Sequence, residues 1–277
     1  MTPLGRWGAG TMRRGAVADD DDEGLRHRPP AAVTAVAMVG AAFLVLPLLA
    51  LMIRAPWSRI GSVLQTPAAL ASLRLSLTTT LSAVAVSLVV GVPLAWVQAR
   101  VTYPGRSLVR AVLTVPLVLP PVVGGIALLL AFGRRGVAGP ALGRAGIVLP
   151  FTTAGAVAAE VFVALPFLVL TVEGALRATD RRVEDAARTL GAGRWTVFRS
   201  VTLPAIRPSL VAGSVLCWAR ALGEFGATIT FAGNLQGRTQ TLPLFVYTTF
   251  QGGDLDAAVI LSLALLVIAL LVLSIIR

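Results

Sequence analysis

The sequence predicts an all-α membrane protein with six transmembrane helices. Its 277 residues are 56% hydrophobic, and the mean hydropathy is +0.83. Charged residues make up 13% of the chain, whereas a soluble domain carries about 25%. The apolar residues come in long blocks, which places the chain in the membrane class.

Six apolar stretches are long enough to cross a bilayer core, which needs roughly 20 residues in a helix. They cover Ala32–Ile53, Leu73–Val97, Val109–Phe132, Thr152–Val172, Ser209–Phe231 and Ala257–Ile276. Several stretches contain proline or glycine, among them Pro120, Pro121 and Gly124. Neighbouring helices or water can satisfy the backbone groups that proline frees, and small residues let helices approach closely. These three residues therefore serve either helix packing or the lining of a substrate pathway.

The chain divides into two regions by composition. Residues 1–30 contain glycine, arginine and proline together with the acidic run Asp19–Glu23. Such a segment has too little apolar surface to fold, so we expect a disordered cytoplasmic N-terminal tail at 1–30. Residues 31–277 form the expected transmembrane domain.

Arginine counting gives the orientation of the spans, because cytoplasmic loops carry an excess of basic residues. With the N-terminus inside, the cytoplasmic segments hold Arg6, Arg13, Arg14, Arg26, Arg28, Arg100, Arg106, Arg110, Arg177, Arg181, Arg182, Arg188, Arg194, Arg199, Arg207 and Arg277. The outer segments hold Arg54, Arg59, Arg74, Arg134, Arg135, Arg144 and Arg238. We therefore expect both termini to be cytoplasmic.

The polar inventory excludes several kinds of chemistry. All 24 basic residues are arginine. A P-loop ATPase and a Schiff-base enzyme each need a lysine, so the sequence excludes both classes. The single histidine, His27, and the single cysteine, Cys217, cannot build a zinc site or a disulfide within the chain. The arginines that give the net charge of +11 cluster beside apolar spans, as membrane topology requires. We therefore expect a lipid bilayer as the partner and no nucleic acid.

The most informative segment is the loop 177–207 between the fourth and fifth expected spans. Apolar residues recur at helical spacing at Val183, Ala186, Ala187 and Leu190. Asp180 can cap the start of this helix, and Glu184 and Asp185 favour the positive end of its dipole. The pattern predicts a short cytoplasmic helix.

Glycines then break that helix. Gly191 and Gly193 suit a turn that needs positive φ or close approach. A second helical pattern follows at Trp195, Phe198 and Val201, and Leu203-Pro204 ends it. We expect two short helices meeting at a glycine corner, with Ala186-Ala187 exposed so that a partner can come close. The aromatic residues are expected to anchor this knob against its own bundle.

Charged residues inside the spans are the remaining candidates. Arg220 and Glu224 are four residues apart, which places them on one face of a helix. Arg220 would lie about 17 Å into the membrane, and Glu160 about 12 Å. Because a charge at mid-bilayer costs roughly 2.5–3.5 kcal/mol, these side chains should face the bundle interior. Arg220 and Glu224 are interpreted as a structural ion pair or as pathway residues, and Glu160 as a possible pathway residue.

The loop resembles the coupling motif of ABC importer permeases. That motif reads E-A-A, three residues, G, nine residues, I, one residue, L-P. The matching residues here are Asp185, Ala186, Ala187, Gly191, Val201, Leu203 and Pro204. Aspartate replaces glutamate at Asp185, valine replaces isoleucine at Val201, and the neighbouring Glu184 can compensate for the shorter acid.

This resemblance implies a type I ABC importer permease fold with a cytoplasmic coupling helix, in a bacterial plasma membrane. It also implies that two copies form the pathway and that the coupling helices dock on two ATPase subunits. ATP and magnesium would bind to those partner subunits, so no cofactor is expected in this chain. An extracytoplasmic binding protein would deliver the substrate.

The stretch from Arg220 also carries a resemblance. R-A-L-G-E-F-G-A-T-I-T-F-A-G-N, followed by T-Q-T-L-P-L, is similar to the molybdate branch of the oxyanion permeases. The implied substrate is molybdate, with tungstate as a possible second one. A sulfate or thiosulfate permease is the alternative within the class. An ion-driven secondary carrier is the alternative from another class, although it would have no use for the loop 177–207.

Overall fold

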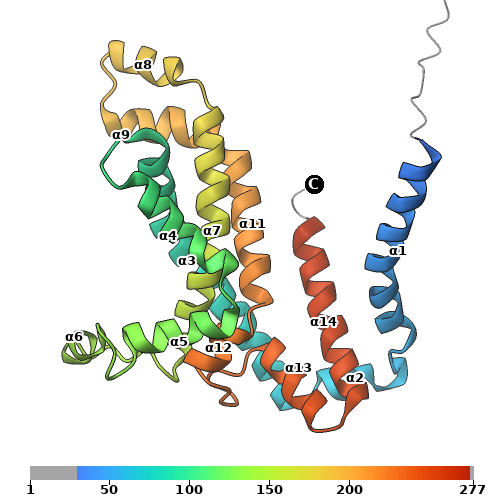
Figure 1. Cartoon of the computed structure of the whole chain (residues 1–277). Coiled ribbons are helices and arrows are strands. Elements are labelled where there is room, and N and C mark those ends of the chain that lie inside the picture. Colours follow the sequence, from blue (N-terminus) through green and yellow to red (C-terminus); the bar gives the residue numbers. More distant parts are fainter. Residues whose placement is uncertain (1–29, 275–277) are drawn as a thin grey trace, which may run out of the picture. The chain divides into compact units, whose positions relative to one another are not determined.

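The computed structural model describes residues 30–274, and the regular structure of these residues is helical (Figure 1). The α-helices are α1 (Ala31–Ile53), α2 (Ile60–Leu64), α3 (Pro67–Arg100), α4 (Arg106–Val118), α5 (Pro121–Phe132), α6 (Gly139–Arg144), α7 (Thr153–Ala178), α8 (Arg181–Thr189), α9 (Arg194–Val197), α10 (Leu203–Ala205), α11 (Arg207–Leu222), α12 (Gly226–Phe231), α13 (Leu242–Gln251) and α14 (Leu255–Ser274). A 3₁₀ turn, η1, covers Trp57–Arg59, and a π-helical turn, η2, covers Phe198–Thr202. The predicted all-α fold is confirmed.

Two units make up the chain, one ending at Leu48 and the other beginning at Leu49. The first contains most of α1, an apolar helix of 23 residues with Pro47 inside it. Residues 1–29 of the predicted tail lie outside the described part, so their predicted disorder stays a prediction. All further contacts described here are within the second unit.

Four of the described helices are long and apolar enough to cross a bilayer, namely α1, α3, α7 and α14. A fifth crossing results if Arg194–Ala205 and α11, which meet at an angle of 71°, are counted as one bent span. The predicted span Val109–Phe132 is wrong as a continuous helix. Its break falls at Leu119, which adopts an extended conformation before Pro120, since proline disfavours helical geometry in the preceding residue.

The predicted span Ser209–Phe231 is also wrong as a continuous helix. The helix α11 ends at Leu222, and α12 begins only at Gly226. The residues between them, Gly223 to Phe225, form the second break.

The main core lies where α3, α7 and α11 pack together. Its buried side chains include Ala83 and Ala95 of α3, Leu168 and Val172 of α7, and Cys217 of α11. Cys217 is fully buried within this core. Small residues on α3 let the larger aliphatic side chains of α7 come close, which is typical of helix contacts in membranes.

The broken helices meet through glycine. A Cβ atom at Gly125 of α5 would lie 2.6 Å from Thr230 Cβ and 2.9 Å from the Ala227 carbonyl of α12. A Cβ at Gly226 would lie 2.7 Å from Pro121 Cβ. The α5–α12 contact therefore requires glycine at both positions. Close packing of helices thus explains these two glycines. At Gly124 a Cβ would be 3.1 Å from the Phe162 ring, a less severe contact.

Candidate functional site

The candidate site is the coupling segment, residues 177–207, at the end of the second unit where α3 finishes and α7 continues into α8 (Figure 1). The Asp180 side chain accepts a hydrogen bond from the Arg182 amide at 2.9 Å, which is the predicted N-cap of α8. Val183 and Leu190 are exposed to 56% and 89%. Ala186 is exposed and Ala187 partly so. The helix thus presents small and aliphatic side chains outward with nothing in the second unit covering them.

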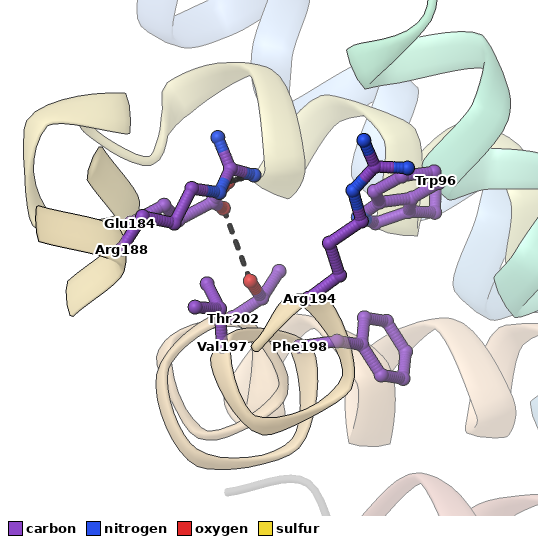
Figure 2. Close-up of a pocket in the computed structure, with 7 residues that line it drawn as sticks. All are labelled: Trp96, Glu184, Arg188, Arg194, Val197, Phe198 and Thr202. Atoms are coloured by element: carbon purple, nitrogen blue, oxygen red, sulfur yellow. Dashed lines mark hydrogen bonds and ion pairs between the residues drawn. The ribbon is translucent and has the colours of Figure 1, made fainter. Parts of the chain in front are cut away.

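Glu184 points the other way, into the protein. Its side chain is 5% exposed and forms an ion pair with Arg100, the last residue of α3, whose side chain is 6% exposed. The nitrogen–oxygen distance is 2.8 Å. The same carboxylate oxygen accepts a hydrogen bond from the Thr202 hydroxyl at 3.1 Å, drawn as a dashed line in Figure 2. Glu184 therefore ties α8 to α3 and to η2.

Asp185, the residue at the acidic position of the motif, has a different environment. Its side chain is 64% exposed and pairs with Arg188 at 3.0 Å. The sequence predicts that Glu184 can compensate for the shorter acidic side chain of Asp185. In the structure the two face different ways: Asp185 faces outward, and Glu184 is buried and paired with Arg100.

Arginines also cover the end of α3. Its last carbonyl groups have no partner within the helix and form the negative end of its dipole. Arg177 and Arg106 donate to the Gln98 carbonyl, and Arg181 donates to the Ala99 carbonyl at 3.0 Å. The excess of basic residues in cytoplasmic loops would by itself account for these arginines. Arg177 and Arg181 also bind the coupling segment to α3.

A second buried carboxylate lies near the C-terminal end of α7. Glu173 of α7 is 2% exposed and accepts a hydrogen bond from Arg177 at 2.6 Å. Arg110 of α4 lies 3.8 Å from the same oxygen. The α4 helix is thereby linked to the same charged network.

The turn between the two short helices depends on one glycine. Gly191 has φ = +86°, a conformation that other residues adopt at a cost, while Gly193 has an ordinary φ of −65°. The predicted requirement for positive φ holds at Gly191 and not at Gly193.

The second half of the segment departs from the prediction. Trp195 is 71% exposed, so it does not anchor the knob in the bundle; it stacks on Phe198 with ring centroids 5.6 Å apart. The buried residues are instead Val197 and Thr202, five residues apart. The π-helical turn η2, whose backbone hydrogen bonds join residues five apart, lies between these two side chains and widens the helical turn there. The i, i+3 spacing read from the sequence missed this turn.

The remaining motif residues lie around the bend into α11. Val201 and Leu203 are partly buried, and Pro204 is exposed in the first turn of α10. The 71° bend follows at Ile206, which is 1% exposed. A cavity of about 340 Å³ lies between this segment and α3, and Figure 2 shows its lining residues.

Arg220 and Glu224 form an ion pair with a 2.7 Å separation. Glu224 is not on the α11 helix, however, because it lies in the break before α12. Its carboxylate accepts a hydrogen bond from the Ala227 amide at 2.7 Å and so caps α12. Glu224 is 1% exposed, whereas the Arg220 side chain keeps 27% of its surface. The prediction of a shared helical face is wrong, although the two side chains do meet.

Glu160 is buried in α7, with 1% exposure. One carboxylate oxygen accepts a hydrogen bond from Thr79 of α3 at 2.8 Å. The other has no hydrogen-bond partner among residues 30–274. Within the same residues there is also no group of three His, Cys, Asp or Glu side chains that could hold a metal ion.

Sequence reasoning missed Arg100 and Thr202 as site residues. The sequence assigns Arg100 to topology alone, because its partner Glu184 is 84 residues away and no carboxylate stands beside it in the chain. Thr202 carries no signal either, because its burial depends on the π-turn.

Comparison with known proteins agrees with this geometry. Residues 89–277 match the family model described as "Binding-protein-dependent transport system inner membrane component". The "Molybdenum transport system permease protein ModB" of Mycobacterium tuberculosis (strain ATCC 25618 / H37Rv) is 49% identical over 238 residues, covering 85% of this chain and 89% of the relative. The "Sulfate transport system permease protein CysT" of Escherichia coli (strain K12) is 36% identical over 233 residues, covering 83% and 84%.

A solved structure supports the fold. In the crystal structure of a bacterial ABC transporter involved in the import of the acidic polysaccharide alginate, one chain matches with a TM-score of 0.69 at 19% identity. The match covers 89% of this chain and 94% of that chain. With several apolar helices in the described part, the protein is a multi-pass membrane protein. The chain belongs to the family of binding-protein-dependent transport system inner membrane components.

Proposed function

We propose that this chain is the permease subunit of an ATP-driven importer that moves molybdate into the cytoplasm. The observation that carries the proposal is the 49% identity to a molybdenum transport permease over 85% of the chain, against 36% to a sulfate permease over a similar length. Tungstate is the expected second substrate. Sulfate or thiosulfate transport is the candidate that the weaker relatives favour.

In this proposal the chain performs no hydrolysis. A separate pair of ATPase subunits binds ATP and magnesium, and α8 is the surface on which one ATPase docks. The exposed Ala186, Val183 and Leu190 support this, because small and aliphatic side chains permit a close apolar contact. Glu184, Asp185, Ala187, Gly191, Val201, Leu203 and Pro204 complete the proposed coupling set.

The proposed assembly has three further components. A second copy of this chain completes the pathway, an extracytoplasmic molybdate-binding protein delivers the anion, and a bacterial plasma membrane holds the complex with both termini in the cytoplasm. The arginine-rich residues 177–207 support this orientation.

Uptake of radiolabelled molybdate tests the substrate. The full transporter, reconstituted with its ATPase and binding protein, should take up molybdate only when ATP is supplied on the side of α8. Excess tungstate should compete, and sulfate at the same excess should not. Strong competition by sulfate would favour the sulfate alternative, and uptake that follows an ion gradient without ATP would favour a secondary carrier.

Arg220 offers a test of the pathway. The Arg220 side chain is 27% exposed and that of Glu224 1%, so Arg220 is the member of the pair to test for contact with a passing anion. Neutralising both in the variant Arg220→Met/Glu224→Gln keeps an acceptor for the Ala227 amide. If the pair is structural only, molybdate uptake keeps its KM; if Arg220 attracts the anion, KM rises. Glu160, Pro120, Pro121 and Gly124 remain possible pathway residues.

A further inference from the structure

Two adjoining cavities lie beside the coupling segment, and the outward-facing Val183, Ala186 and Leu190 of the proposed ATPase contact line neither of them. The first, of about 340 Å³, is lined by Arg188 and Arg194 together with Trp96 and Phe198. The second, of about 410 Å³, shares Trp96, Arg194 and Phe198 with the first and adds Trp195. The two therefore form one groove with a polar part and an apolar part, which we call the α3–α9 groove.

The polar part of the groove carries an excess of positive charge. Its one carboxylate, Glu184, pairs with Arg100 at 2.8 Å and lies 3.9 Å from Arg188. Arg188 is shared with the exposed Asp185. Arg194 has no carboxylate within 4.0 Å among residues 30–274. Figure 2 shows the Arg194 side chain reaching toward Trp96, and both residues line both cavities. An anionic group placed there would find an uncompensated cation.

The apolar part is lined by the end of a helix that is long and apolar enough to span a bilayer. Pro93, Trp96 and Val97 belong to the last two turns of α3, a helix long and apolar enough to span a bilayer and ending in Arg100. Tryptophan and arginine gather at membrane surfaces, because one end of each is apolar and the other is polar. The 71° bend after α10 gives Arg194–Ala205 a direction different from that of α11, so Trp195 and Phe198 lie beside the end of α3.

We propose that the α3–α9 groove binds an anionic phospholipid. The phosphate lies between Arg188 and Arg194, and an acyl chain runs along Trp96, Trp195 and Phe198. Basic pockets between helices near a membrane surface recognise anionic headgroups in this manner. The bound lipid would fill the space between α3 and the second half of the coupling segment.

The ATPase is a less suitable occupant of the groove. Two of the side chains that face outward from α8, Val183 and Leu190, do not line either cavity. The apolar part of the groove is instead bounded by Pro93, Trp96 and Val97 of α3, a helix long and apolar enough to span a bilayer, so a lipid chain can reach it. This inference does not depend on which anion the transporter carries.

Native mass spectrometry of the full-length permease tests the proposal. The protein is purified in a neutral detergent and exposed to equal amounts of phosphatidylglycerol and phosphatidylcholine. Wild-type protein should retain phosphatidylglycerol in preference. The variant Arg194→Gln should lower its affinity about fivefold, the effect of one arginine near an anionic surface. The control Arg199→Gln removes an exposed arginine that lines neither cavity and should leave the affinity unchanged.

A second pair of variants tests the apolar part. Trp195→Ser should weaken phosphatidylglycerol retention, whereas Trp57→Ser, at a tryptophan that is 59% exposed and remote in sequence, should not. Equal retention of the two lipids, equal losses in Arg194→Gln and Arg199→Gln, or displacement of the lipid by millimolar inorganic phosphate would each overturn the proposal. Loss of ATPase binding by Arg194→Gln with unchanged lipid retention would also overturn it and would assign the groove to the ATPase.

Discussion

At the end of the second unit that carries α8, charged side chains are buried and paired between elements, whereas at the opposite end the ion pairs between elements are open to solvent. Arg100 and Glu184 are 6% and 5% exposed. Arg59 of η1 pairs with Asp254 and Asp256 near the start of α14, and all three are between 45% and 55% exposed. The α8 end thus joins α3 to α8 through a buried ion pair, while Arg59 joins η1 to the start of α14 through exposed ones.

The difference has a mechanical meaning under the proposed function. A push on α8 reaches α3 directly through Glu184 and the arginines that bind the α3 carbonyls, so this end can pass on movement as a unit. At the other end, α5 and α12 pack closely through Gly125 and Gly226 but are separated from α4 and α11 by breaks. Those breaks are the places where the bundle can bend. The first two predictions below test one end each.

The largest effect is expected for Glu184→Ala. Removing one partner of a buried ion pair leaves the other charge uncompensated, which costs about 3–5 kcal/mol. Arg100 would be that charge. The measurement is the thermal midpoint of the purified permease, compared with Asp185→Ala, which removes an exposed acid and should change it little. Equal shifts in the two variants would contradict the buried-anchor interpretation, and replacing both Arg100 and Glu184 with apolar residues should recover most of the loss.

A smaller loss is expected for Gly125→Ala. The added methyl group would meet the backbone oxygen of Ala227 and the Cβ of Thr230, neither of which can rotate away. Overpacking of this kind costs about 1–3 kcal/mol. Gly143→Ala is the matched control, because its Cβ would meet nothing within 4 Å. A stable Gly125→Ala protein would show that α5 and α12 can separate without penalty, and the glycine-packing account of this end would then be wrong.

The turn at Gly191 tests the α8 end through transport activity and not through stability. A Cβ at Gly191 meets no atom within 4 Å, so Gly191→Ala acts only through its φ of +86°, at a cost of about 1–2 kcal/mol. The backbone would relax by turning α8 relative to α9. The expected result is less molybdate imported per ATP hydrolysed. Gly193→Ala, equally open in space but at φ = −65°, should keep normal coupling; a similar defect in both would argue against a conformational role for the turn.

Sequence reasoning could predict the features that depend on local chemistry. The Asp180 cap and the Gly191 turn follow from residue type and spacing, and both are present. The broken third and fifth spans were missed because hydropathy does not register a proline or a buried carboxylate as a helix end. Leu119 leaves the helix because Pro120 follows, and Glu224 caps α12 only because α11 has already ended.

Tertiary contacts account for the other differences. The burial of Glu184 and the exposure of Asp185 depend on where Arg100 lies, and Arg100 is 84 residues away in sequence. Helical spacing placed Trp195 toward the bundle, whereas the π-turn directs Val197 and Thr202 there instead. An apolar pattern of three residues is too short to distinguish a π-helical turn from an α-helical one.

The smallest expected effect concerns the exposed ion pairs. The pKa of Asp254 lies below its usual range, first because the Ala257 amide donates a hydrogen bond to it and also because Arg59 is 3.3 Å away. A carboxylate whose pKa is lowered in the folded state stabilises that state above its unfolded pKa, and the contribution disappears as the pH falls through the folded pKa. Asp254→Asn keeps an oxygen acceptor for the Ala257 amide and removes the charge together with the oxygen that faces Arg59.

This variant should therefore have a slightly lower thermal midpoint than wild type at pH 7, and the difference should close as the pH falls below the usual pKa of an aspartate, about 3.9. High salt at pH 7 should also narrow it, because exposed pairs are screened. A loss as large as that of Glu184→Ala, or one that does not change with pH, would show that the exposed pairs carry as much of the stability as the buried one. The contrast between the two ends would then lie in their exposure alone and not in the strength of their charged contacts.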